Sequence, residues 1–169
     1  MNEEEKKFVS PTYGQLSFAE VVFRMGKYMH DEPTYKYRVI VGTDSQENGK
    51  PAHVAHGKSF DFVTAAIIHR IGAGGIYFWQ RERVARPYSL KERMYEEATR
   101  SMVLAQNLME RFEKEGFFGF DLEIHVDIGR VGETREVVNE VVGMIRGSGF
   151  AVKVKPEAYG ASKVADRHV

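Results

Sequence analysis

Apolar residues recur at helical spacing in three long stretches of the chain. The first covers residues 17–29 and begins at a capping box formed by Ser17 and Glu20. The longest begins at a second capping box, Ser89 with Glu92, and runs to about residue 115, with Gly116 just beyond its end. The third covers residues 134–146. A short fourth helix is expected over about residues 158–168, so helices are predicted along the whole chain.

Runs of alternating or β-branched apolar residues predict five strands, at residues 36–43, 62–70, 76–84, 121–128 and 150–155. Residues 45–60 indicate a loop or a weak strand. Short turns favour antiparallel pairing of the first three strands, and the later alternation of helix and strand favours parallel crossovers. We therefore expect an α/β fold with a five-stranded mixed sheet flanked by helices. Strand 36–43 should lie beside strand 121–128 in the middle.

Length and composition indicate one folded domain over residues 1–169, with the first seven residues frayed. The chain has no cysteine, which excludes disulfides and thiolate chemistry. We see neither a signal peptide nor an apolar run that could cross a membrane, so we expect a cytoplasmic protein without membrane contact. The formal net charge is zero. Nucleic acid could therefore bind only through local patches, in a salt-sensitive way.

Two aspartates stand at the ends of strands that are predicted to be neighbours. Asp44 ends strand 36–43, and Asp127 ends strand 121–128. Ligands gather at the carboxyl ends of parallel strands, and two close carboxylates repel unless a cation separates them. Either aspartate alone could be an ordinary turn residue. Together they point to Mg²⁺ or Mn²⁺, which prefer oxygen ligands.

Two further acidic positions could join this pair. On the long helix, Glu97 lies at the margin of the apolar stripe, whereas Glu96 points nearly opposite, toward solvent or toward Arg93 or Arg100. Glu97 is therefore the preferred ligand and Glu96 the alternative. Asp166 lies on the last helix, where spacing alone does not distinguish it from an ordinary surface residue.

Three segments resemble a known family: residues 41–46 (VGTDSQ), 124–127 (IHVD) and 155–166 (KPEAYGASKVAD). They are similar to the YkuK-type predicted nucleases of the ribonuclease H-like superfamily. The resemblance covers residues 36–169 and leaves residues 1–35 as an N-terminal helical extension. It implies a ribonuclease H-like domain and a metal-dependent nuclease acting on RNA, DNA or a hybrid. It also implies four residues that are both catalytic and metal-binding, namely Asp44, Glu97, Asp127 and Asp166.

Several other residues are candidates for lesser roles. Residues near the acidic positions could contact substrate, namely Ser45, Gln46, Lys163 and His168, and His168 could also carry a proton. His125 shares a strand face with Asp127 and could line the site or be structural. One face of strand 76–84 carries Tyr77, Trp79, Arg81 and Arg83. These side chains could stack bases and hold phosphates, or equally cover the underside of a helix or a subunit contact.

Two other functions stay open. The chain could be a nucleic-acid-binding module of the same fold without turnover, although such a module has no physical need for clustered anions. It could also be a hydrolase of a small phosphorylated molecule, which the zero net charge favours modestly. The sequence does not specify an oligomeric state.

Overall fold

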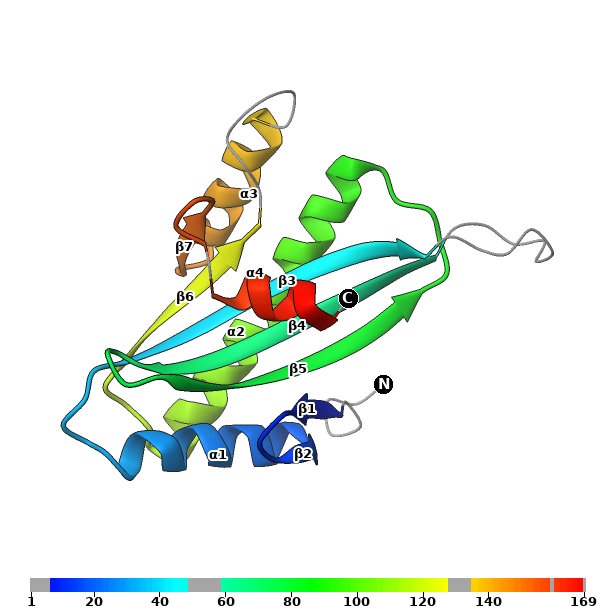
Figure 1. The fold of residues 1–169 in the computed structure, drawn as a ribbon. Coiled ribbons are helices and arrows are strands. Elements are labelled where there is room, and N and C mark those ends of the chain that lie inside the picture. The colour runs from blue at the N-terminus through cyan, green and yellow to red at the C-terminus, as the bar shows by residue number, and fades with distance from the viewer. Residues whose placement is uncertain (1–6, 49–58, 128–134, 159, 169) are drawn as a thin grey trace.

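One mixed sheet organises the part of the chain that the computed structural model describes, residues 7–48, 59–127, 135–158 and 160–168. There the sheet has seven strands in the order β2-β1-β5-β4-β3-β6-β7 (Figure 1). The strands are β1 (Phe8–Ser10), β2 (Gly14–Leu16), β3 (Tyr37–Asn48), β4 (Ser59–Arg70), β5 (Gly75–Val84), β6 (Phe120–Val126) and β7 (Ala151–Val154). The helices are α1 (Phe18–His30), α2 (Leu90–Glu115), α3 (Arg135–Gly147) and α4 (Ala161–His168).

Strand β3 is the centre of this sheet. It pairs antiparallel with β4 along its whole length, from Tyr37↔Arg70 to Asn48↔Ser59. On its other edge it pairs parallel with β6, and this pairing ends at Gly42↔His125. Strands β4 and β5 form an antiparallel hairpin. The mixed sheet and the predicted neighbours β3 and β6 are thus confirmed.

The predicted number of five strands is wrong. The segment before α1 forms a hairpin, β1 with β2, which joins the edge of the sheet through Val9↔Trp79 of β5. The N-terminal extension is therefore not only helical. Each hairpin strand has three residues, too few for an alternation to be recognised in a sequence. Strand β3 also continues to Asn48 and β4 begins at Ser59, where a loop or weak strand was predicted; residues 49–58 lie outside the described part.

The two faces of the sheet are covered differently. The main core lies between the sheet and α1, α2 and α3, and includes Val41 of β3 and Ile124 of β6. The opposite face is crossed by α4, which lies in front of β3, β4 and β5 in Figure 1 while α2 lies behind them. Under α4 a small second core contains Val63, Ala65 and Ala165. Because side chains alternate along β3, Asp44 is on the α4 face and Ser45 is on the α2 face.

The helices begin where the sequence indicates. Ser17 and Ser89 are N-caps, and both capping boxes are present with Glu20 and Glu92. Helix α2 ends at Gly116, whose φ of 76° is left-handed, a conformation that glycine adopts without strain. Among the helices described, none has the length and apolarity needed to cross a membrane.

Candidate metal centre

Asp44 and Asp127 lie just beyond the point where the parallel pairing of β3 with β6 ends. Strand β3 itself runs on to Asn48, paired with β4, so the prediction that Asp44 ends its strand is wrong. The β3–β6 register ends at Gly42↔His125, and each aspartate lies two residues beyond this last pair. The Asp44 side chain is partly buried, and its Oδ1 accepts a hydrogen bond of 2.9 Å from the backbone N–H of Ser45. Burial raises the pKa of Asp44, and the charges of Asp127 and Asp166 raise it further. These carboxylates are therefore close enough to destabilise one another as anions.

Glu97 reaches this end of the sheet from α2, on the opposite face. Its side chain is buried, and its Oε1 accepts a hydrogen bond of 2.5 Å from Ser45 Oγ. Burial raises the pKa of Glu97 to about 7. The charges of Asp44 and Asp127 also raise this pKa, whereas the hydrogen bond from Ser45 and the charge of Arg93 lower it. The guanidinium of Arg93 is close by, with Nε 4.0 Å from Oε1. Glu97 is therefore a buried acid that interacts with both strand-end aspartates.

Asp166 approaches from α4. Helix α4 packs on β3 and β4, and Ala165 is fully buried against Val63 and Ala65. Asp166 itself is exposed, and its charge acts on Asp44 and on Lys155. The last helix therefore brings a fourth carboxylate, distant in the sequence, close enough to act on Asp44 of β3.

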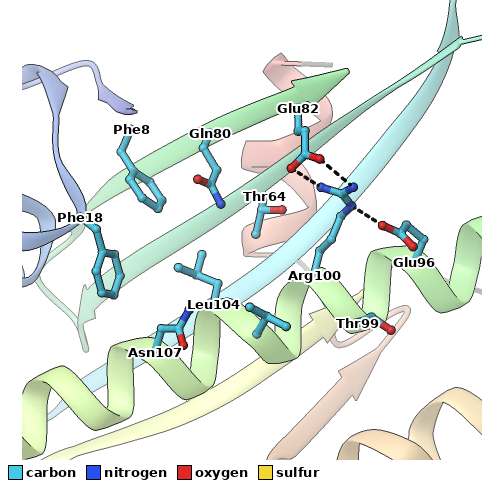
Figure 2. A pocket seen from close by; sticks show the side chains of 11 residues that line it. Phe8, Phe18, Thr64, Gln80, Glu82, Glu96, Thr99, Arg100, Leu104 and Asn107 are labelled. Atoms are coloured by element: carbon cyan, nitrogen blue, oxygen red, sulfur yellow. Dashed lines mark hydrogen bonds and ion pairs between the residues drawn. The ribbon is translucent and has the colours of Figure 1, made fainter. Parts of the chain in front are cut away.

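Glu96, the alternative to Glu97, points away from this group. Its Oε1 accepts a hydrogen bond of 2.8 Å from Arg100 Nε, and Arg100 also pairs with Glu82 of β5 at 2.8 Å. Figure 2 shows the three side chains at one end of a cavity of about 280 Å³ between α2 and the sheet. The other end of this cavity contains Phe8 and Phe18. Glu96 thus belongs to an ion-pair network away from the strand-end aspartates.

Lys155 is a member of this group that sequence reasoning did not assign. It follows β7, whose last pair with β6 is Val126↔Val154, so that Lys155 lies level with Asp127. Its Nζ is 2.5 Å from Asp127 Oδ1. The hydrogen bond with Asp127, followed by the charges of Asp127, Asp44 and Asp166, raises the pKa of Lys155. The signal available in the sequence was its place inside the segment 155–166, but the pairing with Asp127 depends on the β6–β7 register.

Three of the four carboxylates are thus engaged by partners within the chain. Asp44 binds the Ser45 N–H, Glu97 binds the Ser45 hydroxyl, and Asp127 binds the Lys155 ammonium. Within the described residues, no three His, Asp or Glu side chains stand together in a ready arrangement for holding a metal ion. The group is therefore a set of acidic side chains around Asp44 of β3, and three of them are held by donors within the chain.

Comparison with known proteins identifies the family of the chain. A family model described as "Ribonuclease H-like" matches residues 20–169. This chain belongs to the ribonuclease H-like family. It is also 30% identical to the uncharacterized protein YkuK of Bacillus subtilis (strain 168), over 95% of each chain, which makes it a YkuK-type member. No solved structure gave a significant match. Membership of this family suggests a nuclease-type or nucleic-acid-related function.

In this ribonuclease H-like chain, His125 is buried and its contacts are structural. The ring is 1% exposed, and its Nδ1 accepts a hydrogen bond of 3.2 Å from the Gly160 N–H. The ring proton is therefore on Nε2, which lies 2.9 Å from Glu123 Oε1 and donates to it. Burial lowers the pKa of His125. This contact fixes the segment that leads into α4, and so helps to place Asp166.

The residues predicted to contact substrate have different environments. Gln46 and Lys163 are exposed, on β3 and α4 respectively, whereas the hydroxyl of Ser45 binds Glu97. The His168 ring stacks on Trp79 with centroids 4.3 Å apart and an interplanar angle of 10°. His168 thus faces β5, and its role in proton transfer stays a prediction.

The aromatic and basic face of β5 lies partly beneath α4. Tyr77 Oη is 3.4 Å from His168 Nε2, and Arg81 donates a hydrogen bond to the His168 carbonyl. Arg83 pairs with Asp61 through two hydrogen bonds of 2.7 and 2.8 Å. Of the two interpretations of this face, the structure favours packing under a helix. Base stacking on Trp79 would require His168 to move.

Proposed function

We propose that this protein is a metal-dependent nuclease of the ribonuclease H-like type, which hydrolyses phosphodiester bonds in RNA, DNA or a hybrid. The observation that carries the proposal is that carboxylates from α2, the end of β6 and α4 lie near Asp44 of β3, where the pairing of β3 with β6 ends. Their mutual influence is electrostatic: Asp44 responds to Asp127 and Asp166, and Glu97 responds to Asp44 and Asp127. Such a group is costly to keep ionised without a cation.

The donor set fits Mg²⁺ or Mn²⁺. All four candidate ligands, Asp44, Glu97, Asp127 and Asp166, offer carboxylate oxygens, the ligands that these ions prefer. The pKa values of Asp44 and Glu97 are raised chiefly by burial and also by neighbouring carboxylates, so a bound cation would stabilise the ionised form of both groups. A pair of bound divalent ions supplies activation of a water molecule and stabilisation of the leaving oxygen in phosphodiester hydrolysis.

The residues around the carboxylates would prepare the site. Ser45 holds two of the carboxylates: its hydroxyl donates to Glu97 and its backbone N–H donates to Asp44. The exposed cations Lys163 and Arg167 flank Asp166 in sequence on α4 and are available to bind phosphates. Because the net charge of the chain is zero, binding of a nucleic acid by such a local patch should weaken steeply as salt is added.

The test is cleavage of end-labelled RNA, DNA and RNA–DNA hybrid by the wild type and by Asp44→Asn, purified in parallel. We expect cleavage by the wild type with Mg²⁺ or Mn²⁺, none with a chelator, and none by the variant. Glu96→Gln is a matched control and should remain active, because Glu96 binds Arg100. Equal cleavage by the wild type and Asp44→Asn would indicate a contaminating nuclease and would refute the assignment.

A second candidate is a hydrolase of a small phosphorylated molecule, which the zero net charge favours. The same assay should therefore include a small chromogenic phosphodiester and a phosphomonoester. Metal-dependent turnover of a small substrate that requires Asp44, without cleavage of any polymer, would favour this second function. Binding of nucleic acid without any turnover would favour a binding module instead.

A further inference from the structure

We propose that Lys155 is an internal counter-ion of the candidate metal centre, which a divalent ion must displace from Asp127 and which then binds a phosphate of the substrate. This inference rests on the proposed function, since it concerns the same carboxylates. It assigns a role to a side chain that sequence reasoning left without one.

The contact itself is direct. Lys155 Nζ lies 2.5 Å from Asp127 Oδ1, and the ammonium also interacts with the charges of Asp44 and Asp166. One positive charge thus acts on three of the four carboxylates. Arg93, a further cation near the group, lies 4.0 Å from Glu97, whereas Lys155 contacts Asp127. Lys155 therefore supplies charge where a divalent ion would also have to bind.

Two cations cannot occupy this position together. A divalent ion bound through Asp127 Oδ1 would meet the ammonium at the same oxygen, and the two positive charges would repel. The Lys155 side chain is 56% exposed, whereas that of Asp127 is 21% exposed. A lysine has a long flexible stem, so the ammonium can leave the carboxylate by changing rotamers while the backbone stays in place. Displacement is therefore possible without movement of β7.

Once displaced, the ammonium stays tethered next to the carboxylates. Lys155 follows the last residue of β7, and the pairing Val126↔Val154 holds that strand end beside the end of β6. A phosphodiester that approaches Asp44 and Asp127 would come within reach of this freed charge. A lysine ammonium binds phosphate as a point charge and needs no fixed direction. Lys155 would thus exchange a carboxylate partner for a phosphate partner.

The test compares Lys155→Met with wild type and with Lys153→Met. Methionine removes the charge and keeps an unbranched side chain. Lys153 is exposed on β7, two positions before Lys155, and pairs in register with His125. It therefore controls for the loss of a positive charge on this strand. Mn²⁺ binding is measured by calorimetric titration without nucleic acid, and folding is checked by the melting temperature in chelator.

We expect Lys155→Met to bind Mn²⁺ roughly tenfold more tightly, a ratio that corresponds to about 1.4 kcal/mol. Lys153→Met should bind as the wild type does. With saturating Mn²⁺, a non-hydrolysable phosphorothioate oligonucleotide should bind several-fold more weakly to Lys155→Met than to either other protein, as measured by fluorescence anisotropy.

The outcomes separate this inference from the proposed function. If wild type binds Mn²⁺ and Lys155→Met binds it equally or more weakly, Lys155 is no competitor and this inference fails alone. Unchanged binding of the oligonucleotide would refute its second role. If neither protein binds Mn²⁺, the metal centre is refuted and the inference falls with it.

Discussion

The buried carboxyl of Glu97 gives a sharp prediction about the metal-free protein. Its pKa is raised from 4.5 to about 7, chiefly because the side chain is removed from water. The unfolded chain therefore loses this proton at a lower pH than the folded protein does. Between these pH values folding takes up a proton, so the stability of the folded state falls as the pH rises. Glu97→Gln removes this dependence, because the amide stays neutral.

The magnitude follows from the size of the shift. Each pKa unit corresponds to 1.36 kcal/mol, so ionised Glu97 destabilises the folded state by about 3 kcal/mol above the folded-state pKa. The amide oxygen of glutamine can still accept the hydrogen bond from Ser45. We therefore expect the free energy of unfolding of Glu97→Gln, relative to that of the wild type, to rise by about 3 kcal/mol between about pH 4 and about pH 9.

The assay is urea unfolding in chelator across this pH range. Glu96→Gln is the matched control, because it changes the neighbouring residue and loses the ion pair with Arg100. Its stability relative to the wild type should not rise at high pH. Adding Mg²⁺ at high pH should make the wild type more stable than Glu97→Gln, because the ion stabilises only a protein that can ligate it. A difference between Glu97→Gln and wild type that stays constant with pH would refute the reasoning about burial.

Two further substitutions test the packing, one of α4 beside the site and one of α1 far from it. Trp79→Ala should weaken Mn²⁺ binding roughly tenfold, because the Trp79 ring anchors His168 and with it α4. Calorimetric titration measures this affinity, with Asp166→Asn titrated for comparison. An unchanged affinity of Trp79→Ala would contradict the anchoring. Gly26→Ala should cost about 1–3 kcal/mol in urea unfolding, since a Cβ there would lie 2.2 Å from the Phe117 ring. Gly143→Ala, a helical control with open space, should be neutral or gain up to ~1 kcal/mol. If Gly26→Ala and Gly143→Ala change the free energy of unfolding equally, the contact with Phe117 does not determine the cost at Gly26.

The features that could be predicted from the sequence are those set by local rules. A capping box needs particular residues at a fixed spacing, so Ser17 and Ser89 locate the starts of α1 and α2. The helical stripe separates Glu97, which is buried, from Glu96, which pairs with Arg100. Strict alternation along β6 places Asp127 just past its end. Handedness of crossovers then brings β6 beside β3.

The features that were missed depend on contacts between distant segments. The hairpin of β1 and β2 is stabilised by joining β5, and its short strands carry no periodic signal. The contact of Lys155 with Asp127 requires the parallel register of β6 and β7. The stacking of His168 on Trp79 depends on how α4 crosses the sheet, which the spacing within α4 does not determine. Tertiary packing decides each of these positions.

The most direct test of the account is a crystal of the protein soaked in Mn²⁺ and measured at a wavelength where manganese scatters anomalously. We predict anomalous density between Asp44 and Asp127, with Lys155 Nζ withdrawn from Asp127 Oδ1. Density confined to other parts of the surface, with Asp127 still bound to Lys155, would contradict the claim that these carboxylates gather divalent ions.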